Sequence, residues 1–587
     1  MSAASRPRWL AASERRVGLG CMRLSTGDER NRELAFATIT EAAAAGATVF
    51  DTARSYGRGP TELGHNERLL ADALRRCGAT SGARIVTKGG MARTHGAWIP
   101  DGRARTIRAD FETSLADLGG LPIDTYLVHV PDPRTAWRTT VRALARLVDD
   151  GLVGRVGVSN VNRAQLDEAV ELAPIAAVEV AVSPFDDRAL RGGVLDRCAE
   201  LGITVLAHSP LGGPRRAPAL ARLEPLGAIA RAHDATAAEV ALAWLLGLSP
   251  NVVVLPGARR PETARSAAAA SSLELADHER ELLDHAFGGP RPRRPPRTVR
   301  KKPGSEVVVV MGIPGAGKTR VAEEYARRGY ERLNRDERGG TLRALARTLD
   351  ETLTAGRSHV VLDNTYLTRA ERSRVLEASA RHGVPVRCIW LDTPLAAAQV
   401  NVVRRLLDRY GSLPSPDELR RLARSEPGVL APTSQMRALR ELEPPSEDEG
   451  FTTVEHVEFS RALPSGSTAT CVLLAAATLR RPDWERALGY GASEAPRLVF
   501  DWIPDAAGDE LEGLTERLAA TAAGPVESAV CPHHGGPPVC WCRPPLPGLC
   551  LAFAHRHGLD PPGSILVGTS SAHRTLAAAL GARYVTL

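Results

Sequence analysis

The chain has 587 residues, 43% of them hydrophobic and 24% charged, a balance that is typical of a folded globular protein and excludes wholesale disorder. Lys and Arg total 75 against 68 acidic residues, a net charge of +7, and nine cysteines, an odd number, argue against a disulfide framework. No apolar run reaches the roughly 18 residues of a membrane span, and the first ten residues lack the apolar core of a secretion signal. These features predict a cytoplasmic protein with no membrane partner, built from three or four domains of about 150 residues or more.

Between residues 13 and 287, short apolar runs alternate with amphipathic, helix-like stretches. The apolar runs include ATVFDTA, ARIVTKGG, DTYLVHV, VGRVGVSN and GITVLAHSP. Repeated strand–helix units over this length favour an α/β fold of the (β/α)8 barrel type. Enzymes with this fold keep their chemistry where the strands end.

Four polar residues follow these strands and suit the reduction of a carbonyl group: Asp51, Tyr56, Lys88 and His129. Hydride reduction needs a proton donor for the developing alkoxide, and a tyrosine serves if a nearby lysine, held by an aspartate, lowers its pKa. A histidine can then orient the carbonyl. These residues resemble the aldo-keto reductase family over residues 13–287. The resemblance implies that Tyr56 is the acid, that Lys88 and Asp51 tune it, that His129 orients the substrate and that NADPH is the cofactor.

The same resemblance implies contacts to the cofactor. Ser159 and Asn160 would contact the nicotinamide amide, and the candidates for the adenosine phosphate are Arg259 and Arg260. One departure concerns the strand VEVAVSPFD, where the family commonly has a glutamine and then an aromatic ring that stacks on nicotinamide. These positions are Glu179 and Val182 here. Because valine cannot stack, the surface that would hold the nicotinamide ring differs from the family pattern.

The segment 288–303, GGPRPRRPPRTVRKKP, is a candidate linker. Its five prolines forbid a continuous helix and favour an extended spacer. Seven basic side chains and no acidic one lie between residues 291 and 302. Two interpretations stay open, a solvated spacer and an electrostatic contact for phosphates or nucleic acid.

The run EVVVVMGIPGAGKTR is an apolar strand, a glycine-rich loop of the form GxxxxGKT and the start of a helix. Its glycines let backbone N–H groups face phosphates, the lysine bridges β- and γ-phosphate oxygens, and the threonine hydroxyl serves Mg²⁺. The sequence therefore predicts a site for ATP and Mg²⁺ formed by Gly312, Gly315, Gly317, Lys318 and Thr319.

Later segments indicate what accepts the phosphoryl group. A hydroxyl acceptor needs a carboxylate base, and the transition state needs cations from a lid. Asp336 in ERLNRDERGG is the candidate base, and Arg405 in NVVRRLLDRYG is the candidate lid cation. The set GxPGxGK, NRD and DNT resembles the 5′-hydroxyl polynucleotide kinases over residues 304–458. This resemblance implies acceptor contacts from Arg335, Arg343, Asp363 and Thr365. A small metabolite stays open as the acceptor, because kinases of small molecules share this fold.

The segment CPHHGGPPVCWCRPPLPG predicts a metal site. The pattern C-x-H-x6-C-x-C offers four soft or borderline ligands within 12 residues, a set that suits tetrahedral Zn²⁺. The ligands would be Cys531, His533, Cys540 and Cys542.

This loop resembles the zinc-bearing phosphatases of the haloacid dehalogenase (HAD) superfamily, of the histidinol-phosphate and heptose-bisphosphate type, over residues 461–587. Those enzymes begin with hhhDxDGTL, whereas CVLLAAATLR places Leu474 and Ala476 where the two aspartates belong. Their metal motif GDxxxD appears here as VGTSSAHR. Leucine and alanine cannot form an aspartyl-phosphate, and Mg²⁺ lacks its carboxylates. We therefore expect an inactive, phosphatase-like domain with a structural zinc.

The three regions together predict an α/β protein in which a barrel precedes a P-loop kinase and a HAD-like domain. The leading hypothesis is an ATP-dependent polynucleotide 5′-hydroxyl kinase that acts on RNA or DNA ends in repair. The alternative is an NADPH-dependent carbonyl reductase fused to a small-molecule kinase.

Overall fold

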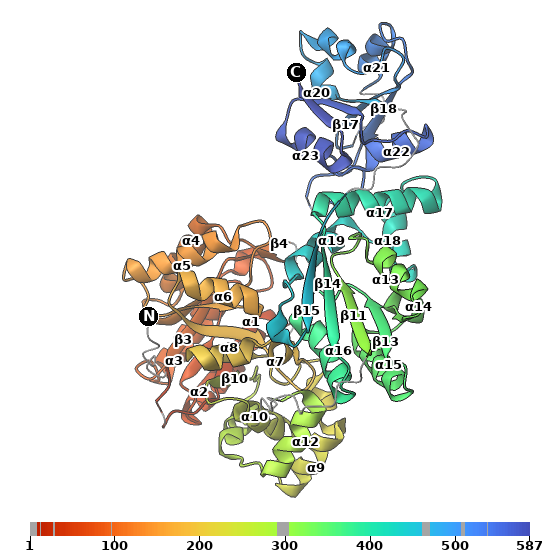
Figure 1. Ribbon diagram of the computed structural model, residues 1–587. Helices are drawn as coiled ribbons and strands as arrows, with labels where there is room; N and C mark the ends of the chain where they lie inside the picture. Colours follow the sequence, from red (N-terminus) through yellow and green to blue (C-terminus); the bar gives the residue numbers. More distant parts are fainter. Residues whose placement is uncertain are drawn as a thin grey trace. The chain divides into compact units, whose positions relative to one another are not determined.

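The computed structural model describes residues 9–11, 13–27, 30–94, 97–289, 304–460, 470–505, 511–536 and 538–587. The chain divides into two compact units, Met1–Pro295 and Pro296–Leu587 (Figure 1). Apart from its first two glycines, the linker predicted at 288–303 lies outside the described residues. No helix in the described part of the chain is long and apolar enough to cross a membrane.

The first unit is a barrel of eight parallel strands. In sheet order they are β1 (Leu19–Gly20), β2 (Val49–Asp51), β3 (Arg84–Gly89), β6 (Ile123–Val128), β7 (Val156–Ser159), β8 (Ile175–Ala181), β9 (Thr204–His208) and β10 (Val252–Leu255). The sheet closes because Val17, just before β1, pairs with Val254 of β10, and the Gly18 N–H donates to the Val254 carbonyl at 2.9 Å. A hairpin of β4 (Met91–Thr94) and β5 (Ala97–Pro100) follows β3. The predicted α/β barrel is confirmed.

Helices alternate with the strands of the barrel. The longer ones are α2 (Arg32–Ala44), α3 (His65–Arg76), α4 (Ala104–Asp117), α5 (Trp137–Asp149), α6 (Arg163–Leu172), α8 (Val194–Leu201), α9 (Glu224–Ala232), α10 (Ala237–Gly247), α11 (Pro261–Ala269) and α12 (Asp277–Phe287). Trp9 and Leu10 pack with the barrel residues Val86 and Leu127, and Trp9 Nε1 donates to Asp124 Oδ1 at 2.7 Å. Because Asp124 lies near the start of β6, this plug closes the end where strands begin, and the opposite end is left for chemistry.

The second unit begins with a five-stranded parallel sheet. In sheet order its strands are β12 (Glu331–Leu333), β13 (His359–Asp363), β11 (Glu306–Met311), β14 (Val386–Asp392) and β15 (Thr453–Glu458). Its helices are α13 (Lys318–Arg327), α14 (Arg335–Arg338), α15 (Leu342–Thr354), α16 (Arg369–Arg381), α17 (Leu395–Tyr410), α18 (Pro416–Ser425) and α19 (Pro432–Glu441). The central strand β11 delivers Gly312 to the carboxyl edge of the sheet. Glu449, from the acidic segment before β15, forms a buried ion pair with Arg372 of α16 (2.6 Å), which ties that segment into this sheet's core.

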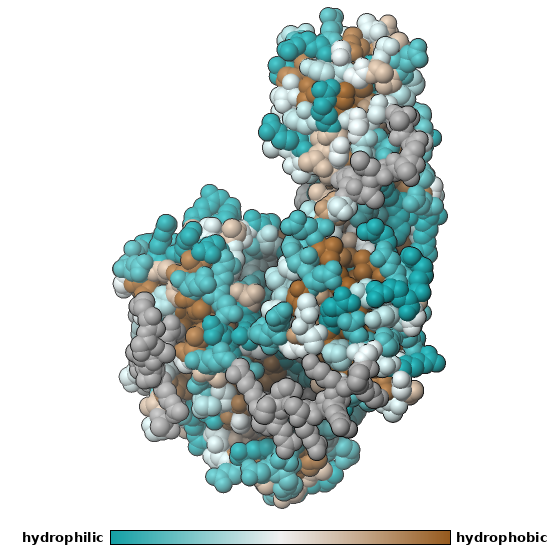
Figure 2. Space-filling model, in the orientation of Figure 1, coloured by the Kyte–Doolittle hydropathy of each residue, from teal (hydrophilic) through white to brown (hydrophobic). Residues whose placement is uncertain are grey.

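A second parallel sheet completes this unit. Its strands, in sheet order, are β18 (Val526–Cys531), β17 (Arg497–Trp502), β16 (Val472–Ala475), β19 (Ile565–Gly568) and β20 (Arg583–Thr586). Its helices are α20 (Ala476–Leu479), α21 (Glu512–Ala519), α22 (Gly548–Arg556) and α23 (Ser571–Leu580). Leu406 and Leu407 of α17 belong to the same buried cluster as Leu473, Cys550 and Phe553, so this sheet shares a core with α17. Figure 2 shows hydrophilic residues over most of the visible surface, with hydrophobic residues in smaller patches.

Candidate functional site

Three of the predicted reductase residues meet where the barrel strands end. Lys88, in β3, is fully buried, and its Nζ donates to Asp51 Oδ1 at the end of β2. The same ammonium group donates to Tyr56 Oη and to the Thr52 carbonyl, each at 3.1 Å. Because β2 and β3 are neighbours in the sheet, their parallel pairing brings Asp51 and Lys88 together.

Lys88 has a second carboxylate partner, which the sequence analysis did not assign. Glu179 Oε2, from β8, lies 3.1 Å from Lys88 Nζ, and the Glu179 side chain is 3% exposed. Burial and then the charge of Glu179 raise the pKa of Asp51 to about 7, while the charge of Lys88 opposes the rise. Burial lowers the pKa of Lys88, but the two carboxylates outweigh it and raise that pKa well above its usual value. One buried cation therefore serves two carboxylates.

Tyr56 and His129 face each other within an aromatic cluster. Their ring centroids are 5.6 Å apart, and Trp98 of β5, which is 39% exposed, lies 6.1 Å from Tyr56. Burial raises the pKa of Tyr56, and the lowering that Lys88 was expected to supply is present but outweighed. Burial, followed by the charge of Lys88, lowers the pKa of His129 well below its usual value. A neutral His129 can donate a hydrogen bond to a carbonyl oxygen.

The residues expected at the nicotinamide amide lie at the ends of later strands. Ser159 is buried at the end of β7, and Asn160 follows it with a φ of 56°. Asn160 Nδ2 donates to the His129 carbonyl at 3.1 Å and to Ser159 Oγ at 3.0 Å. Asn160 Oδ1 lies 3.1 Å from Nε2 of His208, which ends β9 and was not singled out from the sequence. These contacts fix the orientation of the Asn160 side-chain amide.

The residues expected at the adenosine phosphate follow β10. Arg260 is exposed and Arg259 is partly buried. Arg23, in α1 (Met22–Thr26), lies against the same loop, because a Cβ atom at Gly257 would lie 3.7 Å from its Cδ, and burial and then the charge of Arg259 lower its pKa. Neighbouring arginines suit a phosphate, which makes Arg23 a further candidate. Its sequence signal is a basic residue in the short helix that follows the first strand. Val182 is buried, so no aromatic ring occupies that position.

The glycine-rich loop, residues 312–316, has a side-chain donor for every one of its carbonyl groups. The donors and the carbonyl groups they reach are Lys318 to Gly312 and to Ile313 (both 2.9 Å), Gln435 to Pro314 (2.7 Å), Asn401 to Gly315 (2.8 Å) and Thr393 to Ala316 (3.1 Å). Fixed carbonyl groups fix the peptide planes, which is what a cradle for phosphate oxygens requires. Gln435, Asn401 and Thr393 were not assigned this role from the sequence.

Backbone conformations that favour glycine occur in this loop and at the residue directly after it. Gly315 and Gly317 have φ values of 86° and 97°, which only glycine adopts without strain. A Cβ atom at Gly315 would lie 2.4 Å from the Ala398 carbonyl of α17. Lys318 and Thr319 then begin α13, and burial lowers the pKa of Lys318 to about 8. The predicted phosphate loop is thus present with its lysine folded back on the loop.

Asp336 lies on the short helix α14, which Asn334 caps. Asn334 Oδ1 accepts from the Asp336 N–H at 2.7 Å, and Asn334 Nδ2 donates to the Asp363 carbonyl at 2.8 Å. These bonds tie the start of α14 to the end of β13. The charge of Asp336 acts on the pKa of both Lys318 and Arg405. The candidate base therefore lies within electrostatic range of the loop lysine and the lid arginine.

Two of the predicted acceptor residues make contacts with the protein itself. The buried Asp363 carboxylate is held in bidentate fashion by Arg332 of β12, at 3.1 and 2.7 Å. Thr365 lies beside the loop, because its carbonyl accepts from the Gly312 N–H at 3.3 Å. Asp363 therefore joins β12 to β13, a role for which the sequence offers no local signal.

The candidate arginines lie on three different helices. Arg335 is 3.5 Å from Asp336 on α14, and Arg343 is exposed at the start of α15. Arg405, on α17, donates to the Gly428 carbonyl at 2.5 Å. Burial lowers the pKa of Arg405, and the charge of Asp336 opposes that effect.

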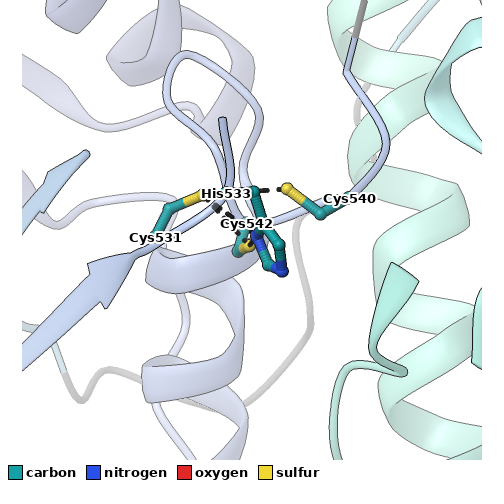
Figure 3. A group of neighbouring side chains, drawn as sticks. All are labelled: Cys531, His533, Cys540 and Cys542. Atoms are coloured by element: carbon teal, nitrogen blue, oxygen red, sulfur yellow. Dashed lines mark hydrogen bonds between the residues drawn. The ribbon is translucent and has the colours of Figure 1, made fainter. Parts of the chain in front are cut away.

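The four predicted metal ligands converge on one point (Figure 3). Their donor atoms lie within 4.8 Å of one another. Cys531 Sγ is 3.7 Å from Cys540 Sγ and 3.4 Å from Cys542 Sγ, and His533 Nδ1 is 3.3 Å from Cys542 Sγ. Thiolates bound to Zn²⁺ at about 2.3 Å in a tetrahedron stand about 3.8 Å apart. The donor set and its spacing therefore fit Zn²⁺.

The carboxyl edge of the second sheet carries apolar side chains at the two expected aspartate positions. Leu474, in β16, and Ala476, at the start of α20, are both fully buried. Asp501 of β17 is paired with Arg480 at 2.8 Å. His573, where a metal-binding acid is expected, is partly exposed on α23.

A closed barrel with this Tyr–Lys–Asp cluster and neighbouring histidine is typical of carbonyl reductases, and the tied glycine-rich loop is typical of P-loop kinases. Residues 16–286 match the aldo/keto reductase family, and residues 307–424 match an AAA domain. The chain belongs to the aldo/keto reductase family and carries a P-loop kinase-like domain after the barrel. The family resemblance of the barrel is confirmed.

Several known proteins are similar to the barrel. An aldo-keto reductase of Strobilurus tenacellus is 30% identical over 288 residues, which cover 44% of this chain and 80% of that protein. A probable aldo-keto reductase of Glycine max is 28% identical over 302 residues, covering 46% of this chain and 84% of that protein. A crystal structure of an aldo-keto reductase from Klebsiella pneumoniae in complex with NADPH is 25% identical, covers 47% of this chain and 92% of that one, and has a TM-score of 0.40.

Proposed function

We propose that residues 304–458 transfer the γ-phosphoryl group of ATP to the 5′-hydroxyl of a polynucleotide. The observation that carries this proposal is that Asn334 ties the start of α14, which carries Asp336, to the end of β13, the strand beside the one that leads into the phosphate loop. A carboxylate base beside a P-loop lysine and a lid cation is what a hydroxyl acceptor requires.

In this proposal, Asp336 accepts the proton of the hydroxyl group as its oxygen attacks the γ-phosphorus. The bond from that phosphorus to the β–γ bridging oxygen breaks, and ADP leaves. Lys318 exchanges its carbonyl partners for β- and γ-phosphate oxygens. Thr319 would hold Mg²⁺, which would supply neutralising charge for the phosphates. Arg405 adds positive charge as the γ-phosphoryl group moves.

The test is phosphorylation of oligonucleotides by the full chain with γ-labelled ATP and Mg²⁺. Lys318→Ala and Asp336→Asn should each abolish labelling. Glu337→Gln is the matched control, because Glu337 neighbours Asp336 on α14 and is paired with Arg332 at 2.8 Å. Equal loss in Glu337→Gln and Asp336→Asn would count against a base role for Asp336.

The acceptor is chosen by comparing 5′-hydroxyl RNA, 5′-hydroxyl DNA and small hydroxylated metabolites in the same assay. Exposed Arg343 and the half-exposed Arg335 favour an acceptor that carries phosphates. If a metabolite is labelled and no oligonucleotide is, the domain is a small-molecule kinase and not a polynucleotide kinase. Labelled RNA or DNA alone would assign the polynucleotide class.

We propose a second activity for the barrel, NADPH-dependent reduction of a carbonyl compound. It is supported by the Tyr56–Lys88–Asp51 contacts and by the neutral His129. Tyr56→Phe should abolish oxidation of NADPH in the presence of aldehydes, whereas Lys318→Ala should leave it unchanged. No aldehyde-dependent oxidation of NADPH by the wild-type chain would refute this activity.

For residues 461–587 we propose a phosphatase-like domain without phosphatase activity, which binds one structural Zn²⁺. The ligand geometry and the apolar side chains at 474 and 476 support this. The division into 13–287, 304–458 and 461–587, joined by the linker at 288–303, is part of the same proposal. So is a cytoplasmic location, which the nine unpaired cysteines favour.

A further inference from the structure

The predicted zinc loop carries a buried tryptophan between two of its ligands. Trp541 stands between Cys540 and Cys542 and is 2% exposed. Its backbone carbonyl accepts from the Gly548 N–H at 3.1 Å. Its Nε1 does not bond within its own sheet but donates to the Leu430 carbonyl at 3.0 Å. The metal site is therefore one residue away from a contact with the connection between α18 and α19.

That connection, residues 426–430, is also held from α17. Arg405 donates to the Gly428 carbonyl at 2.5 Å. Glu426 pairs with Arg409 at 2.5 Å and accepts from Tyr410 Oη at 2.7 Å. Segment 426–430 thus accepts hydrogen bonds from both Arg405, the candidate lid cation, and Trp541.

Apolar packing joins the same parts. Val403, Leu406 and Leu407 of α17 belong to one buried cluster with Leu546 and Leu551 from the chain that follows the zinc loop. An ion pair at 3.2 Å between Arg404 of α17 and Asp560 adds to it. Helix α17 also supplies Asn401, which holds the P-loop carbonyl of residue 315. One helix therefore contacts the phosphate loop and the zinc-loop region.

Without an ion, the described part of the zinc loop is held by a few polar contacts, among them His534 Nε2 to Asp505 Oδ1 at 3.2 Å. Its cross-loop side-chain bonds come from Arg543, which donates to the carbonyls of His534 and Gly536 at 3.0 and 2.6 Å, and from Trp502, which donates to the His533 carbonyl at 2.7 Å. Thiolates this close repel one another unless a cation lies between them. The position of Trp541 should then depend on the metal.

We infer that Zn²⁺ bound by Cys531, His533, Cys540 and Cys542 holds Trp541 against Leu430, and that Trp541 is a positioning residue for the Arg405 side of the kinase site. The inference rests on the proposed kinase only for its effect on catalysis. Its structural part, a metal-dependent contact that holds segment 426–430, does not depend on which molecule accepts the phosphoryl group.

The experiment uses the full chain, its metal content and amide hydrogen exchange of segment 426–430. We expect one Zn²⁺ per chain. Removal by a chelator should raise exchange in this segment at least about fivefold, the equivalent of one lost hydrogen bond, and ZnSO4 should restore it. Trp541→Phe should keep the Zn²⁺ yet raise exchange in the same way, because the ring remains and the donor is lost.

Trp502→Phe is the matched control. Trp502 also donates to the zinc loop, through the His533 carbonyl, but has no hydrogen bond to segment 426–430 in the described structure. It should leave exchange of that segment unchanged. In the labelling assay, Trp541→Phe should lower kcat at least about fivefold with little change in KM for ATP, because Arg405 acts on the transition state.

Three results would overturn the inference: a full chain that binds no Zn²⁺, unchanged exchange of segment 426–430 after chelation, or equal effects of Trp541→Phe and Trp502→Phe. If no polynucleotide is labelled but exchange depends on the metal and on Trp541 as expected, the metal-dependent contact is supported and the proposed acceptor is wrong. The two failures are therefore distinguishable.

Discussion

The Pro314 carbonyl of the phosphate loop is held by one buried side chain. Gln435, on α19, is fully buried, and its Nε2 donates to that carbonyl at 2.7 Å. Gln435→Met keeps the approximate length and volume of the side chain but removes the donor. The carbonyl then loses its side-chain hydrogen-bond donor. We predict a free-energy cost that can be measured in the stability of the protein and in its binding of ATP.

Leaving a buried acceptor without a partner costs about 1–3 kcal/mol. If the loop keeps its position in the ATP-free protein, the free energy of unfolding falls by that amount. If the loop relaxes instead, the cost reappears on binding as a rise in the Kd for ATP of about 5- to 150-fold, at about 1.4 kcal/mol for each factor of ten. The two losses together should therefore total about 1–3 kcal/mol.

The assay combines calorimetric titration with ATP and Mg²⁺ and urea unfolding, followed on the transition that ATP shifts. Gln399→Met is the control, since Gln399 is a buried glutamine on α17 with no hydrogen bond to the loop in the described structure. If Gln435→Met changes neither the Kd nor that transition, the reasoning that side-chain ties hold this loop is refuted. Equal losses in both variants would refute it as well.

Two other contacts give predictions of the same kind. Arg372→Met leaves the buried Glu449 carboxylate without its ion pair and removes the donor to the Tyr366, Leu367 and Glu443 carbonyls, so it should lower the free energy of unfolding by about 3–5 kcal/mol in urea titrations. A double change with Glu449→Met should recover only the part that comes from the unpaired carboxylate. Glu179→Gln removes a charge that raises the pKa of Asp51, so Asp51 stays ionised beside Lys88 to lower pH and the acid limb of NADPH oxidation should move to lower pH. An acid limb that does not move, or moves upward, would contradict that assignment.

Much of the barrel site could be predicted from the sequence, because strand order alone places the ends of all strands at one edge. Asp51, Tyr56 and Lys88 follow neighbouring strands, so their meeting depends only on parallel pairing. Glu179 differs from the glutamine that the family commonly has there, but the sequence does not predict its contact with Lys88. It reaches Lys88 from β8, which is not hydrogen-bonded to β3, and only the closed barrel brings the two side chains within 3.1 Å.

The phosphate loop shows the same limit. Its glycines, lysine and threonine form a local motif and could be read directly. Apart from Lys318, the donors that fix its carbonyl groups lie 77, 86 and 121 residues later in the chain, at Thr393, Asn401 and Gln435. Each is an ordinary polar residue in a helical or loop segment, and spacing gives no reason to select it. Asp363 shows the opposite case, in which a residue selected by motif is held by a neighbouring strand through Arg332.

Packing in the last sheet bears on the proposed loss of phosphatase activity. Leu474 lies in a buried apolar cluster with Val472, Val499 and Val567, and its side chain is fully buried there. An aspartate at this position would place a carboxylate among aliphatic side chains, at a cost of several kcal/mol, without a metal-binding acid at His573. If the proposed phosphatase-like assignment is right, we therefore expect that restoring one acid does not restore phosphatase activity. This sheet still provides a Cys/His cluster that could hold a metal ion, and a core shared with α17, the helix that also holds the phosphate loop through Asn401.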